Sequence, residues 1–240
     1  VLLLAVPDFG AILAILDAAR AALPLTAFEF LCAGALARVL QAQQRAAPYG
    51  TAAAYHLLIE FEDAGEREEQ IANLFQSWMD AGWVLDGVAA QSGAEAERLW
   101  ALREEVSETL SRHRPYKNDI SVRISQLPAL VEQVGALVEQ HYAGWEVIWY
   151  GHIGDGNLHL NILPPEGMAA ADFAAHCKTA SDAIAQVLQQ LGGSISAEHG
   201  VGLLKKAQLG ASRSTEEIRL MQAIKAVFDP KGILNPGKIF

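Results

Sequence analysis

The segment Tyr150–Leu163, which reads YGHIGDGNLHLNIL, limits the fold of this 240-residue chain more than any other feature of its sequence. Polar and apolar residues alternate on both sides of Asp155-Gly156, and an Asp-Gly pair between alternating runs is typical of a tight β-hairpin turn. With a two-residue turn at this point, His152 lies directly opposite His159, and Asn161 lies on the same face. We therefore expect two antiparallel strands with one polar and one apolar face.

The two histidines of this hairpin are candidate metal ligands. Directly opposed residues have Cβ atoms about 4.5–5.5 Å apart, which suits two imidazoles that converge on one ion. A stacked or hydrogen-bonded pair of histidines without a metal is the alternative for the same spacing. The glycines around the pair favour the metal site, because they allow close backbone approach and a rigid arrangement.

A third ligand is expected from the stretch GGSISAEHGVG. Residues 194–197 have the pattern of a short strand, which delivers Glu198 and His199 into a glycine-lined turn. Two histidines and one carboxylate form sites for catalytic zinc and for non-haem iron, so the pattern predicts a metal without identifying it. The alternative is an exposed charged pair in a loop.

The rest of the sequence alternates short β-patterned runs with amphipathic helices. Strands are predicted at residues 1–6, 25–32, 55–62, 83–89 and 119–124. Helices are predicted after Asp8, between 32 and 55, and at 66–81, 94–111, 128–142 and 170–191. A last helix begins at a capping box formed by Ser214 and Glu217. Its predicted inward residues are Ile218, Met221, Ile224 and Val227.

This order of elements favours an α+β fold, in which helices pack on an antiparallel sheet. Many of the predicted strands have one polar face, whereas the strands of a doubly wound parallel sheet are apolar on both faces. No glycine-rich phosphate loop follows the first strand, so a nucleotide site of the usual kind is not expected in these residues. The chain begins at Val1 directly in a strand, which suggests a piece of a longer protein.

Charge and cysteine content restrict the partners. The formal net charge is −10, from 18 Lys and Arg against 28 Asp and Glu, and such a chain repels the phosphates of nucleic acids. Because no apolar run approaches the roughly 20 residues of a membrane span, we expect neither a span nor a signal peptide. The two cysteines, Cys32 and Cys177, have apolar neighbours and are expected to be reduced, buried thiols of a cytoplasmic protein.

An acidic chain that binds an acidic small molecule must concentrate its few cations near the ligand, and residues 99–122 contain candidates. Arg103 and Ser107 are one helical turn apart, and Lys117 opens the next predicted strand. We expect all three side chains to converge over a small carboxylate. The alternative is that Arg103 belongs to a solvated, charged helix face.

Three segments, GHIGDGNLHLNI, GGSISAEHGVGLLKK and DPKGILNPGKIF, match one family when they occur together and in this order. They resemble the C-terminal half of the FAD-linked D-2-hydroxy-acid dehydrogenases, a group of vanillyl-alcohol-oxidase-type flavoproteins that includes enzymes for D-lactate, D-2-hydroxyglutarate and glycolate. The resemblance covers essentially the whole chain. It implies a ferredoxin-like cap domain in residues 1–228, which binds the substrate, and a tail in residues 229–240, which returns to an FAD-binding domain.

The resemblance also implies a role for each candidate residue. The implied ligands of a divalent metal, zinc or manganese, are His152, His159 and Glu198. The implied base at the substrate hydroxyl is His199, and a base near neutral pKa beside a Lewis acid suits removal of that proton. The implied contacts with the acid are Arg103, Ser107, Lys117 and Asn161. The implied contacts with FAD or its domain are Asn235 and Lys238.

As a member of this family, the chain is expected to be the substrate-binding part of an enzyme that oxidises a D-2-hydroxy acid by hydride transfer to FAD. The FAD-binding domain is not among these residues, so the chain alone is expected to be inactive. Two alternatives stay open: a separate metal-binding subunit that partners a flavoprotein, and a metallohydrolase or non-haem iron oxygenase with the same ligands. The sequence does not identify the acid, the electron acceptor or the metal, and it leaves a homodimer open.

Overall fold

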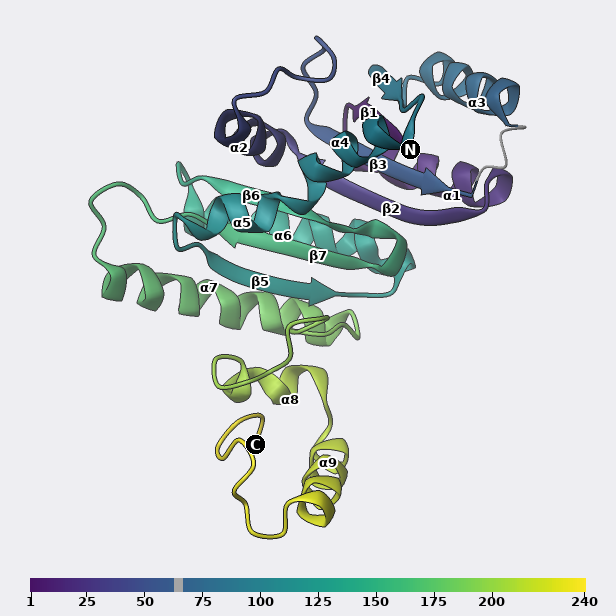
Figure 1. The fold of residues 1–240 in the computed structure, drawn as a ribbon. Coiled ribbons are helices and arrows are strands. Elements are labelled where there is room, and N and C mark those ends of the chain that lie inside the picture. The colour runs from purple at the N-terminus through teal and green to yellow at the C-terminus, as the bar shows by residue number, and fades with distance from the viewer. Residues whose placement is uncertain (63–66) are drawn as a thin grey trace. The chain divides into compact units, whose positions relative to one another are not determined.

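The structure, a computed structural model, describes residues 1–62 and 67–240. These residues form two compact units. The first consists of Val1–Pro115 and Val147–Gly154, and the second consists of Tyr116–Glu146 and Asp155–Phe240. Strands and helices alternate in both units, as Figure 1 shows.

The first unit contains five strands and the helices between them. The strands are β1 (Leu2–Val6), β2 (Leu25–Cys32), β3 (Tyr55–Phe61), β4 (Asp86–Ala89) and β6 (Val147–His152). The helices are α1 (Phe9–Ala22), α2 (Ala33–Gln43), α3 (Glu68–Asp80), α4 (Gly93–Glu104) and α5 (Val106–Ser111). The strands are ordered β4-β1-β3-β2-β6, and each neighbouring pair is antiparallel.

The apolar sequence LLLAV makes β1 an interior strand, and all five of its residues are buried. Asp8 caps the helix that follows, because its Oδ1 accepts a hydrogen bond of 2.8 Å from the backbone N–H of Ala11. From that start, α1 packs on β1 and β2 and buries Ile12, Ile15 and Leu16. Burial of each such side chain contributes about 1.5–3 kcal/mol to folding.

The second unit pairs β5 (Tyr116–Ser121) with β7 (Asn157–Ile162) in antiparallel register. Its helices are α6 (Leu127–Tyr142), α7 (Ala170–Gln190), α8 (Leu209–Ser212) and α9 (Thr215–Phe228), with short 3-10 turns η1 (Ile124–Gln126) and η3 (Lys206–Gln208). α7 lies along β5, and α6 packs on α7 (Figure 1). The hydroxyl of Ser181 on α7 donates a hydrogen bond of 2.9 Å to Asn118, so α7 covers the face of β5 to which Asn118 points.

The predicted hairpin connects β6 to β7, but its turn differs from the prediction. The 3-10 turn η2 (Ile153–Asp155) precedes Gly156, so residues 153–156 form a four-residue connection and the two-residue turn is wrong. Gly156 has φ +71°, and a Cβ there would lie 2.1 Å from the carbonyl oxygen of Val122. The close approach of this turn to the end of β5 therefore requires glycine.

The longer turn also changes the register of the hairpin. The backbone N–H of Leu163 donates to the carbonyl of Glu146 at 3.0 Å, whereas a two-residue turn predicts Ile148 as its partner. The predicted direct pairing of His152 with His159 is therefore wrong. A shift of two residues still leaves every side chain on its predicted face, because side chains alternate with a period of two. The strand order extends to β4-β1-β3-β2-β6-β7-β5, and the predicted α+β class with an antiparallel sheet is confirmed.

Several predicted boundaries move. The helix expected at 94–111 is divided at Glu105 into α4 and α5. The strand expected at 119–124 ends at Ser121, because Ile124 already begins η1. The ends of helices and strands depend on local backbone hydrogen bonds, and side-chain periodicity alone does not locate them.

Two short predicted strands are reduced. The strand expected at 83–89 is limited to β4, and the strand expected at 194–197 forms isolated bridges from Ser194 and Ser196 to β5. The helix expected at 66–81 is present as α3, while its expected first residue, Glu66, lies outside the described residues. The division of the chain after residue 228 stays a prediction.

The last helix begins as predicted but does not bury the predicted residues. In the capping box, the backbone N–H of Glu217 donates to Ser214 Oγ at 3.2 Å, and that of Ser214 donates to the Glu217 carboxylate at 2.7 Å. The inward orientation of Ile224 and Val227 is wrong, since these residues are 59% and 77% exposed. Ile218 and Met221 are half-buried. Helical periodicity identifies an apolar side but not the surface that covers it.

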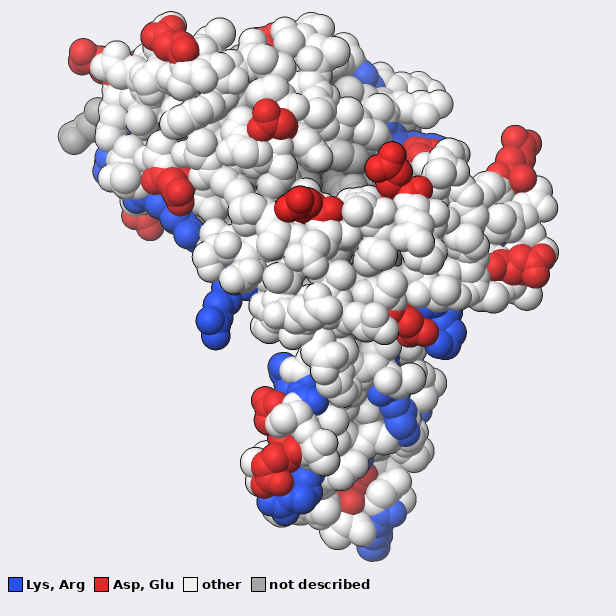
Figure 2. All heavy atoms as spheres, turned by 180° about the vertical axis from the view of Figure 1, so that it is seen from behind, with Lys and Arg blue, Asp and Glu red and all other residues white. Residues whose placement is uncertain are grey.

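The surface and the cysteines agree with an acidic chain of reduced thiols. On the face in Figure 2, acidic and basic side chains are interspersed with broad uncharged areas. Cys32 and Cys177 are both free; Cys177 is buried as expected, whereas Cys32 is only half-buried. Among the described residues, no helix combines the length and the apolar character needed to cross a bilayer.

The buried histidine of β3 generates a prediction about acid stability. His56 Nδ1 lies 2.6 Å from the hydroxyl of Tyr49, and burial lowers the pKa of His56 from 6.5 to about 4. Between these pH values the unfolded chain binds a proton that the folded chain does not bind, so the free energy of unfolding falls as pH falls. The pKa difference corresponds to a loss of up to about 3 kcal/mol.

Urea denaturation at pH values from 7 to 4 measures this loss. We expect His56→Gln to show a shallower pH dependence than the wild type in that window. Replacement of an exposed histidine, His113→Gln, serves as the control and is expected to leave the slope unchanged. Equal slopes for wild type and His56→Gln would contradict the assignment.

Candidate functional site

One face of the β5–β7 pair is lined with polar side chains. The register pairs Lys117 with Asn161, Asp119 with His159, and Ser121 with Asn157. Paired residues, and alternate residues along each strand, point to the same face of a sheet. These side chains lie on the face opposite α7, and Asp119, Asn157, His159 and Asn161 are buried there. The strand pair thus brings together residues that the sequence assigned separately to substrate and to metal.

Asp119 is fully buried and holds the loop that carries Glu198 and His199. Its Oδ2 accepts hydrogen bonds of 2.8 Å and 2.9 Å from the backbone N–H groups of these two residues. Burial acts to raise the pKa of the Asp119 carboxyl, but the two hydrogen bonds and the nearby histidines outweigh it and hold the pKa below its ordinary value. Asp119 is therefore an ionised carboxylate at neutral pH.

Two imidazoles stack beside this carboxylate. The rings of His159 and His199 have centroids 5.6 Å apart and planes inclined by 15°. Nδ1 of His159 lies 3.6 Å from Asp119 Oδ1, and Nδ1 of His199 lies 3.8 Å from Asp119 Oδ2. His159 is buried, whereas the side chain of His199 is 52% exposed. His199 therefore combines access for a small molecule with a carboxylate close to its ring.

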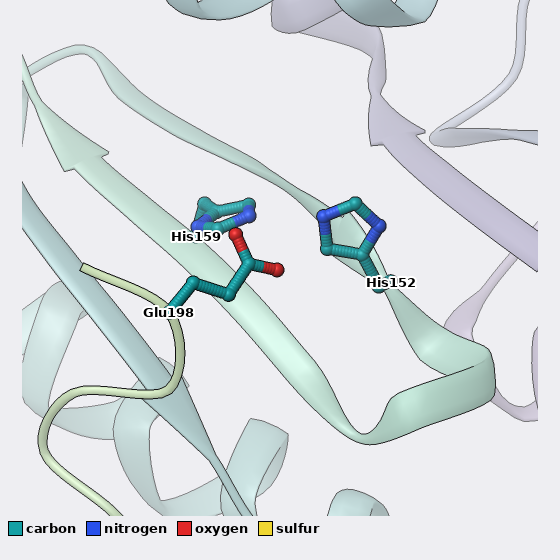
Figure 3. Close-up of side chains that lie close together, drawn as sticks. All are labelled: His152, His159 and Glu198. Carbon is teal, nitrogen blue, oxygen red and sulfur yellow. The ribbon is translucent and has the colours of Figure 1, made fainter. Parts of the chain in front are cut away.

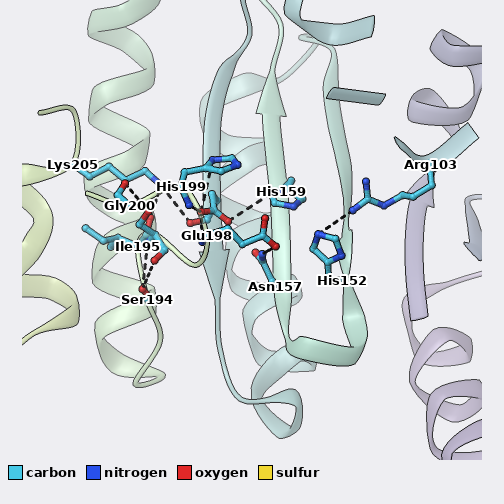
Figure 4. Close-up of polar contacts among 12 residues, drawn as sticks. Arg103, His152, Asn157, His159, Ser194, Ile195, Glu198, His199, Gly200 and Lys205 are labelled. Carbon is cyan, nitrogen blue, oxygen red and sulfur yellow. Dashed lines mark hydrogen bonds and ion pairs between the residues drawn. The ribbon is translucent and has the colours of Figure 1, made fainter. Parts of the chain in front are cut away.

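Further polar contacts fix the loop, as Figure 4 shows. Asn157 Nδ2 donates a hydrogen bond of 2.6 Å to Glu198 Oε1. Lys205 Nζ donates to the carbonyls of Ile195 at 2.6 Å and of Asp119 at 3.3 Å. Burial lowers the pKa of Lys205, while the charge of Asp119 opposes this effect. The carboxylate of Glu198 is thereby held at the same strand pair as His159.

In the first unit, the buried carboxylate of Glu29 on β2 holds Arg103 and His152. Glu29 lies directly opposite His152 in the β2–β6 register. Its Oε2 accepts a hydrogen bond of 2.9 Å from Arg103 Nε, and its Oε1 lies 2.8 Å from His152 Nδ1. Arg103 Nη2 lies 3.3 Å from His152 Nε2 (Figure 4). Arg103 is only 7% exposed, so the alternative of a solvated helix residue is wrong.

His152, His159 and Glu198 have the donor set of a metal site (Figure 3). His159 and Glu198 belong to the second unit and His152 to the first, and each residue offers one ligand atom. Two imidazole nitrogens and one carboxylate oxygen are ligands that zinc accepts, with open positions left for other ligands. The residue types therefore fit a divalent ion.

The remaining predicted site residues lie in several places. Arg103 lies in the last turn of α4, and Ser107 is exposed on α5. Asn235 and Lys238 lie in the tail after α9, where Lys238 Nζ donates to the carbonyl of Pro236 at 3.3 Å. Convergence of Arg103, Ser107 and Lys117 on one acid, and contact of the tail with FAD, stay predictions.

Sequence reasoning missed three polar residues that organise the site, namely Glu29, Asp119 and Asn157. Each occupies one position of a strand whose pattern is otherwise read as alternation. A buried charge or amide in a strand normally has a hydrogen-bond or charge partner. A polar residue at an inward-facing strand position was therefore the one signal in the sequence that could have identified these three residues. Their partners are far away in the sequence, and local patterns do not identify them.

Comparison with known proteins identifies a matching family and related sequences. Residues 1–239 match a family model described as "FAD linked oxidases, C-terminal domain". The chain is 49% identical over 240 residues to D-2-hydroxyglutarate dehydrogenase of Stutzerimonas stutzeri (strain A1501), with 100% of this chain and 52% of that protein covered. It is 36% identical over 219 residues to the mitochondrial D-2-hydroxyglutarate dehydrogenase of Danio rerio, with 89% and 39% covered. The chain thus spans about half the length of the curated relatives it matches most fully.

A solved structure has the same fold. The 4-ethylphenol oxidase of Gulosibacter chungangensis, in an isoeugenol complex, superposes with a TM-score of 0.64 at 15% sequence identity. The match covers 99% of this chain and 53% of that chain. At this identity the likeness supports the architecture and carries no information on the substrate.

The pair of Glu29 with Arg103 generates a prediction about stability. Replacement Glu29→Gln leaves the buried guanidinium of Arg103 without its counter-charge, and breaking a buried pair in this way costs about 3–5 kcal/mol. We expect a loss of this size in chemical denaturation. The control, Glu216→Gln, breaks an exposed pair with Arg219 and is expected to cost less than about 1 kcal/mol. Similar losses in both variants would show that the buried pair has no special role.

Proposed function

Because the chain belongs to the family of FAD-linked oxidase C-terminal domains, we propose that it is the substrate- and metal-binding part of an FAD-dependent dehydrogenase for a D-2-hydroxy acid. The resemblance found in the sequence motifs is confirmed by the family match. Relatives named D-2-hydroxyglutarate dehydrogenase match over the full chain, so D-2-hydroxyglutarate is the acid we propose first. The observation that carries the proposal is the group of His152, His159 and Glu198 beside His199.

The proposed metal ligands are His152, His159 and Glu198. When bound, a divalent ion there supplies a Lewis acid that favours loss of the proton from the 2-hydroxyl group of the acid. The two histidines offer neutral imidazole nitrogens, and Asn157 holds the Glu198 carboxylate through Oε1. Flavin supplies the hydride acceptor, which we place in the part of the protein outside this chain.

His199 is the proposed base. Its backbone is anchored to Asp119, while its side chain remains about half exposed, so a small acid has access to the imidazole. Oxidation of the alcohol carbon releases a hydride from carbon and a proton from oxygen. We propose that the imidazole of His199 takes this proton and that the nearby Asp119 carboxylate stabilises the resulting imidazolium.

Cationic and amide side chains are proposed to bind the carboxylates of the acid. Lys117 and Asn161 lie directly opposite each other on the polar face of the β5–β7 pair, which suits one carboxylate group. Arg103 is neutralised in part by Glu29, and Arg103 with Ser107 is the proposed second contact. A dicarboxylic acid would use both sets of contacts, whereas lactate or glycolate has only one carboxylate.

The last helix and the tail support a protein larger than this chain. Ile224, Val227 and Phe228 on α9, and Ile233 and Leu234 after it, are all more than half exposed. Exposed apolar side chains close together mark a surface that another part of a protein covers. We propose that this surface packs on the FAD-binding part, and that Asn235 and Lys238 in the same tail reach that part.

Anaerobic absorption spectra of the natural full-length polypeptide test the proposal. We expect a flavin spectrum that is bleached by D-2-hydroxyglutarate faster than by D-lactate or glycolate. The variant His199→Ala is expected to retain flavin but to slow this bleaching at least about 100-fold, the usual contribution of a general base. His113→Ala, which replaces an exposed histidine of the first unit, is the control and is expected to behave as wild type.

Three results would contradict the proposal. A colourless full-length protein that needs a separate flavoprotein for activity would support the alternative of a metal-binding subunit. Hydrolysis of esters or amides, or oxygen consumption with ferrous iron and without flavin, would support a metallohydrolase or an oxygenase. Unchanged bleaching by His199→Ala would remove His199 from its proposed role.

Removal of metal ligands gives a separate prediction. The double variant His152→Ala/His159→Ala removes both imidazole ligands, so we expect little or no zinc or manganese to copurify with the full-length protein. Elemental analysis by mass spectrometry measures the bound metal per polypeptide. A double variant of two exposed histidines, His113→Ala/His176→Ala, controls for nonspecific binding. Full metal content after loss of both ligands would refute the site.

A further inference from the structure

We infer that Asp119 is the positioning residue of the proposed site, because one buried carboxylate sets both the loop of Glu198 and His199 and the ring orientation of His159. The inference rests on the proposed function and assigns a role to a residue that contacts neither substrate nor metal. Asp119 lies in the middle of β5, directly opposite His159 on β7, and is fully buried.

The first role of the carboxylate is to hold the loop. Oδ2 accepts hydrogen bonds from two successive backbone N–H groups, those of Glu198 and His199. These bonds link a loop residue pair to a strand about 80 positions earlier, with sequence separations of 79 and 80. Hydrogen bonds to an ionised acceptor are shorter and stronger than neutral ones. The proposed metal ligand Glu198 and the proposed base His199 are thereby fixed to one atom.

The main chain of Asp119 reinforces this attachment. Its carbonyl oxygen accepts hydrogen bonds from the backbone N–H of Ala197 at 3.3 Å and from Lys205 Nζ at 3.3 Å. Lys205 also binds the carbonyl of Ile195, within the same loop. The loop is therefore attached to Asp119 before Glu198, through Ala197, and after His199, through Lys205.

The second role concerns His159. With Oδ2 committed to the loop, the other oxygen, Oδ1, is directed toward Nδ1 of His159 at 3.6 Å, and Oδ1 accepts no hydrogen bond from the described residues. Metal-binding histidines typically donate their second ring N–H to a carboxylate, which fixes the tautomer. A proton on Nδ1 that faces Asp119 leaves the Nε2 lone pair for a metal. An ionised carboxylate suits this position, because it can only accept a hydrogen bond and so favours an N–H group at Nδ1 of His159.

The variant Asp119→Asn separates the two roles. An amide oxygen in place of Oδ2 still accepts the N–H groups of the loop, whereas the amide NH2 group then faces Nδ1 of His159 and donates to it. That contact favours the tautomer with the proton on Nε2, which has no lone pair for a metal. We expect the Zn²⁺ dissociation constant of the full-length protein, measured by chelator competition, to rise about 10–100-fold. The control, Ser121→Ala on the same strand face, is expected to keep the wild-type value.

A measurement on the unaltered side chains does not depend on how well the variant folds. Histidine-selective ¹⁵N NMR of metal-free full-length protein distinguishes the two tautomers, and His159→Gln assigns the His159 signals. We expect Nδ1 of His159 to carry the proton in the wild type. A proton on Nε2 would overturn the inference.

The two proposals fail in different ways. If wild-type protein binds Zn²⁺ and Asp119→Asn binds it equally tightly, Asp119 has no positioning role while the proposed metal site stands. If wild-type protein binds no Zn²⁺ or Mn²⁺ at all, the proposed metal site fails, and an Nδ1 proton on His159 would still support the contact with Asp119.

Discussion

The antiparallel pairing of β5 with β7 is the constraint on which the site depends. Once Asp119 is paired with His159, the alternation of side chains directs Lys117, Ser121, Asn157 and the other odd-numbered residues to one face. The even-numbered residues point to the opposite face, where Ile120, Leu158 and Leu160 are buried and α7 packs on β5. A register shift of one residue would exchange these two faces, so the packing of the core also fixes the polar face.

Two buried carboxylates are stabilised in different ways, one in each unit. Glu29 has a counter-ion, because Arg103 donates to it and His152 lies next to it. Asp119 instead relies on the dipoles of backbone N–H groups. Both arrangements offset the cost of removing an ionised group from water. In each case the carboxylate faces a histidine at Nδ1 and so acts on the orientation of a proposed ligand.

The sequence predicted correctly the elements that are determined by neighbouring residues. β1 was found from its apolar run, β2, β3 and the hairpin were found from alternation, and the cap of α1 was found from Asp8. The turn type was wrong because the approach of Gly156 to Val122, a contact between distant segments, decides the conformation. The predicted burial of Ile224 on α9 was wrong for a related reason, because apolar periodicity does not indicate which surface, if any, covers that side of the helix. Glu29 and Asp119 were missed because their partners lie 74 and 79 residues away.

The side chains of the candidate site suit one half of the proposed reaction, the removal of the proton from the hydroxyl oxygen. Oxidation of an alcohol carbon needs a group for the proton on oxygen and an acceptor for the hydride on carbon. His199, Lys117 and Asn161 suit the oxygen side of such an acid, since they offer a base, a cation and an amide. The chain contains no glycine-rich phosphate loop after its first strand, and it spans about half the length of the curated relatives it matches most fully. We therefore keep the acceptor side of the reaction as a proposal for residues outside this chain, with the exposed apolar surface of α9 and the tail as the proposed contact.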